Sequence, residues 1–254
     1  MKPVVFSGYG GALCRLPHAK RRADEVKSAI DDYLAGNPYC VSIDQDSRTI
    51  TASGTDICSA SGVGLTLGDV FHNLRSALDN LAVALVLANS GNTANVGFPT
   101  GSDKEAFHES VWKSNFKRAG FLACAEISKM EFYPGGKGAL IHALNTHNII
   151  DKHYIPIPVA HTVVLKSLQV LSPSGHVLLS DRMHERNITD NSSELYSFGG
   201  NCKVEFDDAL VTEVCLSEPE IFAFKPIGAL LESLQASVEV IVHFFDSDER
   251  FKPS

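Results

Sequence analysis

The chain changes character near Tyr154, and this change constrains the fold more than any other feature of the sequence. Before this point, apolar residues recur every three or four positions, as they do on the buried face of a helix. After it, segments rich in β-branched and aliphatic residues alternate with polar turns such as 172–175. A closing apolar helix is expected over 226–245. The pattern predicts an α+β fold, in which a helical N-terminal half packs with a mostly antiparallel C-terminal sheet and that helix.

The expected elements follow from apolar spacing and from helix-start and turn residues. Pro17 suits a first helical turn, Thr66 an N-cap, and Ser102 with Glu105 a capping box. No internal repeat or long linker appears, so a single domain over 1–254 is expected, helix-rich over 17–153 and strand-rich over 154–224. The predicted helices cover 17–34, 67–88, 102–118, 121–131 and 139–152, a hairpin pairs 39–43 with 48–52, and strands cover 155–170, 177–179, 203–206 and 211–216.

Composition excludes several classes of protein. The 254 residues are 44% hydrophobic, which is enough for a sizeable core. The net charge of −8 argues against non-specific DNA binding, although it leaves room for a local cationic pocket. The longest apolar run, 81–88, is too short to cross a membrane. The six cysteines form no C-x-x-C pair and no secretory signal is recognisable, so buried thiols in a cytoplasmic protein are expected.

The first candidate motif is a polar helix stripe within residues 68–80. His72, Arg75 and Asp79 share one narrow face at spacings i, i+3 and i+7. That face contains none of the lysine and glutamate that usually cover an exposed helix, and it becomes apolar one turn later. A solvated helix face is one interpretation of the stripe, but these two details favour a lined groove or a hydrogen-bonded polar cluster. Arg75 with Asp79 is also compatible with a purely structural i,i+4 ion pair.

The second candidate motif covers residues 145–153. His147 and Asp151 are spaced i, i+4 and continue an apolar helix stripe, so the carboxylate is placed to hold the imidazole in one tautomer. Lys152 and His153 follow at the helix end, where the helix dipole favours cations. The alternative is a buried His–Asp pair that ties this helix to the sheet.

Metal binding is a weaker interpretation of the same residues. A site built from His72, Asp79, His147, Asp151 and His153 requires the two helices to face each other. No H-E-x-x-H or comparable ligand spacing occurs, and no nucleotide-binding loop is recognisable. We therefore expect neither a metal nor a cofactor.

The two motifs resemble those of a widespread family of uncharacterised bacterial proteins. That family has a G-(D/E)-x-x-H-N-L-R-S-A-L-D-H segment, an F-P pair, and an N-x-x-D-K-H segment followed by strands. The resemblance covers most of the chain but implies no established function. The matching residues here are Gly68, Asp69, His72 to Asp79, Phe98, Pro99, Asn148, Asp151, Lys152 and His153.

A looser resemblance links the first motif to HEPN-type helical domains, many of which are metal-independent ribonucleases with an R-x4-6-H pattern. The resemblance implies that Arg75 neutralises the scissile phosphate, that a histidine does acid–base work, and that the site forms across a homodimer. Asn80 stands in the histidine's position and cannot exchange a proton near neutral pH. His72, His147 or His153 would then have to supply that group.

Three functions remain open on this basis. The first is a binding or phage-defence type of protein, with RNA or a small molecule as ligand and the motifs forming a polar network beside a helix-lined site. The second is a HEPN-like ribonuclease, and the third is a metal-dependent hydrolase. A cytoplasmic homo-oligomer is expected by analogy with HEPN domains.

Overall fold

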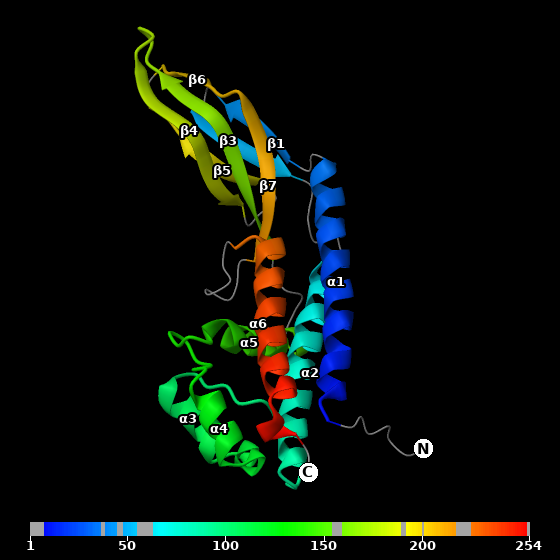
Figure 1. The fold of residues 1–254 in the computed structure, drawn as a ribbon. Helices are drawn as coiled ribbons and strands as arrows, with labels where there is room; N and C mark the ends of the chain where they lie inside the picture. Colours follow the sequence, from blue (N-terminus) through cyan, green and yellow to red (C-terminus); the bar gives the residue numbers. More distant parts are fainter. Residues whose placement is uncertain are drawn as a thin grey trace. The chain divides into compact units, whose positions relative to one another are not determined.

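The structure is a computed structural model with an α+β architecture (Figure 1). It describes residues 8–36, 39–44, 48–54, 63–153, 159–188, 192–199, 201–216 and 225–252. Within these residues the helices are α1 (Gly10–Ala35), α2 (Val63–Ala88), α3 (Lys104–Trp112), α4 (Phe121–Ser128), α5 (Ala139–His153) and α6 (Ile227–Ser247), with 3-10 turns η2 (Asn115–Ala119) and η3 (Glu249–Phe251). The strands are β1 (Tyr39–Asp44), β2 (Thr49–Gly54), β3 (Val159–Leu171), β4 (Val177–Ile188), β5 (Ser192–Ser197), β6 (Lys203–Glu205) and β7 (Asp208–Leu216).

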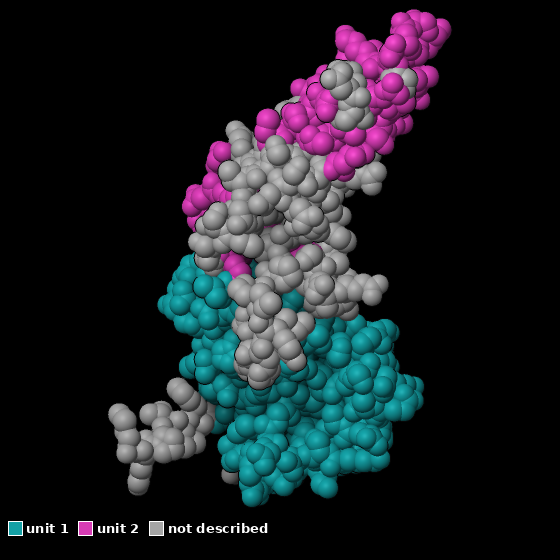
Figure 2. All heavy atoms as spheres, turned by 180° about the vertical axis from the view of Figure 1, so that it is seen from behind, with its two compact units in different colours: residues 1–25, 65–156, 228–254 teal, residues 26–64, 157–227 magenta. Residues whose placement is uncertain are grey.

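The chain divides into two compact units (Figure 2). Unit 1 comprises residues 1–25, 65–156 and 228–254 and is helical, while unit 2 comprises 26–64 and 157–227 and contains the strands. Each unit is assembled from segments that are distant in the sequence, because the hairpin of β1 and β2 lies between α1 and α2. The single domain expected from the sequence stays a prediction.

Unit 2 contains two antiparallel sheets, as the strand pattern predicted. In the first sheet β2 lies between β1 and β5, and Ile50 of β2 pairs with Tyr196 of β5. In the second, β3 is central, with β4 on one side and both β6 and β7 on the other. The long strand β3 thus organises most of the unit.

The core of unit 2 joins residues of both sheets. Ile50 of β2 packs in one cluster with Leu165 and Leu168 of β3, and all three are fully buried. Leu165 and Leu168 are three residues apart, so strict strand alternation would place them on opposite faces. Ser167 between them has φ +54°, and this local break in the pleat allows both leucines to face the core. The cluster is completed by Val170, Phe198, Cys202 and Val204.

In unit 1, α1 and α2 lie side by side and antiparallel. Arg15 Nη1 donates to Asn73 Oδ1 at 3.2 Å, and Asn80 Nδ2 donates to the Gly11 carbonyl at 3.3 Å. The buried face of α1 includes Ala19, which has almost no side chain and so permits close approach of a neighbouring helix. The other buried residues of this face within unit 1 are Ala12, Leu16 and Ala23.

Several predicted helix starts were wrong by a few residues. Helix α1 begins at Gly10, so Pro17 lies inside it, where its missing N–H leaves a gap in the helical hydrogen bonding. Helix α2 begins at Val63, so Thr66 is inside the helix rather than its N-cap. In α3 the capping residue is Asp103, whose side chain accepts from the Ala106 N–H at 2.7 Å. Local spacing indicates that a helix forms but leaves its first turn undefined.

Strand β5 was not predicted, because its sequence, S-S-E-L-Y-S, has no clear apolar alternation. Strand β5 forms because its backbone pairs with that of β2. The thiols also differ from expectation: Cys14 and Cys40 are exposed, whereas Cys124, Cys202 and Cys215 are buried. Cys58 lies outside the described residues.

Helix α6 is long and apolar enough to cross a membrane by length and composition alone, and among the described residues it is the one helix that is. Core helices of soluble proteins pass the same test. Leu231, Leu234 and Val238 of α6 are fully buried within the protein.

Tyr9 makes the stability of unit 1 sensitive to alkaline pH. Its hydroxyl donates to the Phe251 carbonyl at 2.6 Å, and burial, with Asp246 and Asp248 contributing, raises its pKa to about 12. The folded state therefore favours the neutral phenol, and this contribution is complete below pH 10 and lost as the pH rises through 12. We expect urea denaturation to show a loss of up to about 3 kcal/mol over this window that is smaller in Tyr9→Phe. Equal losses in both proteins would contradict this.

Candidate functional site

Helix α2 is buried around most of its circumference, including part of its polar face. Most of its apolar residues are buried, with Leu65 and Leu87 as exposed exceptions, and Asn73 and Arg75 are buried as well. Asn73 Nδ2 donates to the Asp69 carbonyl at 2.7 Å while its side-chain oxygen accepts from Arg15. Unpaired polar groups are costly in a protein interior. The hydrogen-bond partners of the polar side chains on this face therefore indicate whether they hold the fold together or are free to bind a ligand.

Arg75 and Asp79 hold the chain segment at Phe98. Arg75 Nη2 donates to Asp79 Oδ1 at 2.9 Å and to the Phe98 carbonyl at 2.8 Å, and the Phe98 N–H donates to the same Asp79 oxygen at 2.8 Å. Arg75 is only 8% exposed, and burial lowers its pKa while the Asp79 carboxylate opposes that shift. Arg75, Asp79 and the Phe98 backbone, here called the Phe98 clamp, leave the guanidinium little surface for a ligand.

The two sequence motifs meet in space. His72 Nδ1 of α2 lies 3.3 Å from Asn148 Oδ1 of α5, and its Nε2 lies 3.5 Å from the Ser76 hydroxyl. His147 stacks on Phe71, with ring centroids 5.1 Å apart, and is 1% exposed. The imidazole of His147 is thus a core side chain between α5 and α2, and His72 lies at the edge of the same contact.

The side-chain contacts of the last three residues of the second motif are not described. Asp151, Lys152 and His153 form the last turn of α5, but their side chains lie outside the described residues, so the proposed His147–Asp151 contact stays a prediction. Among the side chains that the structure describes, no group of three metal-ligating residues is found.

The polar pocket nearest to the first motif lies between α1 and α2 and has a volume of about 510 Å³. We call it the α1–α2 pocket. It is lined by Gly11, Cys14, Arg15, His18 and Asn80, all in unit 1. None of these residues carries a carboxylate, and Arg15, His18 and Asn80 all have side-chain hydrogen-bond donors.

Neighbouring contacts define what the pocket offers a ligand. Arg21 Nη2 lies 2.7 Å from His18 Nδ1, and because a guanidinium can only donate, this nitrogen accepts and Nε2 carries the proton. Arg15 uses one nitrogen on Asn73 and keeps further donors. The pocket therefore combines an exposed guanidinium, an imidazole N–H and an amide, which together suit an anionic group.

Sequence reasoning missed Arg15 and His18, and a signal for them was present. The first 23 residues contain five Lys or Arg and no Asp or Glu, in a chain whose net charge is −8. A sign asymmetry of this kind indicates a local anion-binding surface. The motif pattern drew attention to Asn80 instead, which lines the same pocket.

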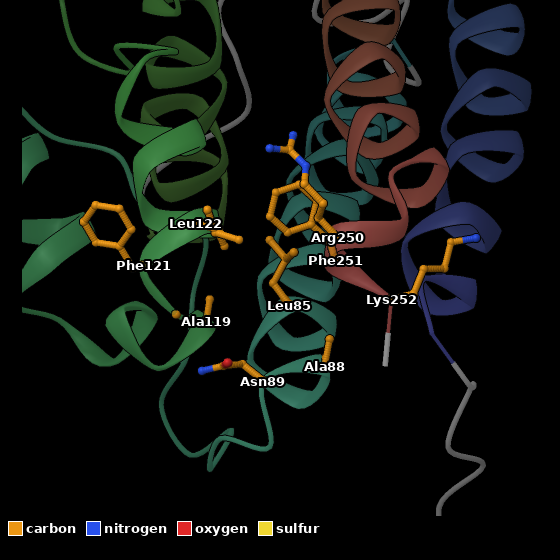
Figure 3. Close-up of a pocket in the computed structure, with 11 residues that line it drawn as sticks. Leu85, Ala88, Asn89, Ala119, Phe121, Leu122, Arg250, Phe251 and Lys252 are labelled. Carbon is orange, nitrogen blue, oxygen red and sulfur yellow. The ribbon is translucent and has the colours of Figure 1, made fainter. Parts of the chain in front are cut away.

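A second pocket in unit 1, of about 170 Å³, lies at the C-terminal end of α2 (Figure 3). Leu85 and Phe251 lie at its centre, with Arg250 and Lys252 around it. Both cations already have partners, since Arg250 lies 2.7 Å from Asp248 and Lys252 lies 3.4 Å from Glu249. This pocket is thus a poorer anion site than the α1–α2 pocket.

Comparison of the chain with protein-family models, with curated proteins and with solved structures finds no match. Its function therefore has to be argued from the geometry of its own residues.

Proposed function

We propose that this protein is a binding protein whose ligand carries an anionic group and occupies the α1–α2 pocket. The observation that carries the proposal is the convergence of Arg15, His18 and Asn80 on one cavity without a lining carboxylate among the described residues. A volume of about 510 Å³ lies in the range of small-molecule sites. The excess of cations in the N-terminal half of α1, before Asp24, attracts an anion despite the negative net charge of the chain.

The Phe98 clamp and the contact between His72 and Asn148 support a structural role for the two motifs. Arg75 already donates to two acceptors, and Asp79 accepts from two donors. Arg75 Nη1 is buried without a hydrogen-bond partner, but Arg75 as a whole is only 8% exposed. Groups that are paired and buried in this way stabilise a fold and are poorly available for catalysis. The motifs then form the frame, and the pocket beside them binds the ligand.

One observation favours a HEPN-like ribonuclease as the second candidate. His18 lines the same pocket as Asn80, so an imidazole lies beside the position at which the HEPN pattern has its histidine. In that case Arg15 rather than Arg75 would neutralise the phosphate, and His18 would exchange the proton.

Isothermal titration with inorganic pyrophosphate and with a short RNA tests the anion pocket. Arg15→Gln is expected to weaken binding about 10- to 100-fold, because a charge-assisted hydrogen bond contributes about 1.5–3 kcal/mol. Lys20→Gln is the matched control, since Lys20 is an exposed cation of the same helix that does not line the pocket. Equal losses in both variants, or no binding by the unmodified protein, would refute the site.

Cleavage of a mixed RNA pool, with and without EDTA, separates binding from catalysis. Binding without cleavage is expected. EDTA-resistant cleavage that is lost in His18→Ala but kept in His176→Ala, an exposed histidine of unit 2, would instead establish the ribonuclease. Cleavage that EDTA abolishes would favour the metal-dependent hydrolase.

A further inference from the structure

An apolar pocket of about 460 Å³ lies between the start of α5 and the C-terminal half of α6, entirely within unit 1. It shares no lining residue with the α1–α2 pocket. We call it the α5–α6 pocket. Its apolar lining includes Phe132, Leu140, Ile141, Val240, Ile241 and Phe244.

The pocket combines a buried floor with an exposed apolar wall. Phe132, Ile141 and Ile241 are buried, whereas Val240 is 69% exposed. Val240 is the one large apolar side chain of α6 that is exposed, and the other exposed positions of the helix are polar, such as Glu232, or alanine. A ligand that covers Val240 removes apolar surface from water, and this burial favours binding.

One cation lies at this otherwise apolar pocket. Lys137 is the single charged residue among the described lining residues. Its ammonium lies 3.9 Å from the Glu131 carboxylate, and the Lys137 side chain is 78% exposed, so this ion pair is weak and the ammonium is available. The other polar lining side chain near the wall, Ser237, already donates to the Ser233 carbonyl at 2.7 Å.

We propose that the α5–α6 pocket binds an aliphatic carboxylate of medium chain length. The hydrocarbon chain lies on the buried floor and against Val240, and the carboxylate pairs with Lys137. Charge complementarity selects this occupant, because a neutral apolar ligand would make no use of Lys137, the single charged residue in the described part of the lining. The α1–α2 pocket is more polar, with donors from Arg15, His18 and Asn80, so the two sites take different ligands.

Titration calorimetry with decanoate, below its micelle concentration, tests this proposal, with decanol and hexanoate as comparison ligands. Decanoate is expected to bind more tightly than either. Lys137→Gln is expected to weaken decanoate binding about three- to fivefold, as for an exposed ion pair, and to leave decanol binding unchanged. Val240→Asp is expected to weaken decanoate binding more than tenfold, because it replaces an apolar contact of the hydrocarbon chain with a charged carboxylate.

Leu87→Asp is the matched control, since Leu87 is also an exposed apolar residue but does not line the pocket. It is expected to bind decanoate normally. Equal affinity for decanol and decanoate, or binding that Val240→Asp does not change, would overturn the proposal. A concentration-dependent dimer that Val240→Asp disrupts, with no decanoate binding, would overturn it in favour of a second copy of the chain as the occupant.

Discussion

Arg75→Ala is expected to lower the free energy of unfolding by about 3 kcal/mol, because it removes a buried cation that donates to Asp79 and to the Phe98 carbonyl. Asp79→Ala is expected to cost about 1–3 kcal/mol, since its side chain is 40% exposed and water can replace part of what is lost. Urea denaturation of purified protein gives both values.

The two residues act as one unit, so their effects are not expected to add. The double variant should lose less than the sum of the single variants, because each single change already breaks the Phe98 clamp. Asp24→Ala, at an exposed aspartate of α1, serves as control and is expected to stay within about 0.5 kcal/mol of the unmodified protein. If Arg75→Ala leaves the free energy of unfolding unchanged, the structural role of Arg75 is refuted, and Arg75 becomes a candidate for phosphate binding again.

Gly101→Ala is expected to destabilise the protein by about 3 kcal/mol or more. Gly101 follows the clamped segment, and its N–H donates to the Phe132 carbonyl at 3.1 Å. A Cβ at this position would lie 2.5 Å from the Phe107 Cα and 2.7 Å from its Cβ, so the backbone of α3 would have to move. Backbone atoms cannot move aside as easily as a flexible side chain can, so even this small substitution is costly. Thermal and urea denaturation measure the loss.

Gly228→Ala is the control for this substitution. Gly228 lies in α6, and a Cβ there would meet nothing within 4 Å. The helix propensity of alanine is expected to make this variant as stable as the unmodified protein or more stable by up to about 1 kcal/mol. Similar destabilisation of both variants would show that glycine replacement as such, and not the contact with α3, is responsible.

The sequence anticipated the candidate site only in part. The polar stripe of α2 and the His147 segment of α5 were recognised because helical spacing is a local property, and their choice as candidates identified two helices that do touch. The hydrogen-bond partners of these side chains could not be predicted, because they are distant in the sequence. Arg75 donates to a carbonyl 23 residues away, and His72 contacts Asn148, which is 76 residues away. Arg15 and His18 were overlooked because they match no motif.

The sequence by itself determined the α+β class, the antiparallel sheets and most of the helices, because apolar periodicity acts over a few residues. Only the tertiary structure decided that β5 pairs with β2, that the hairpin of β1 and β2 belongs to the strand-containing unit, and that Asn80 of α2 reaches Gly11 of α1. Asn80 and Gly11 are 69 positions apart in the sequence, and the paired residues of β2 and β5 are farther apart still. Such pairings depend on the packing of whole elements, which no local pattern of residues records.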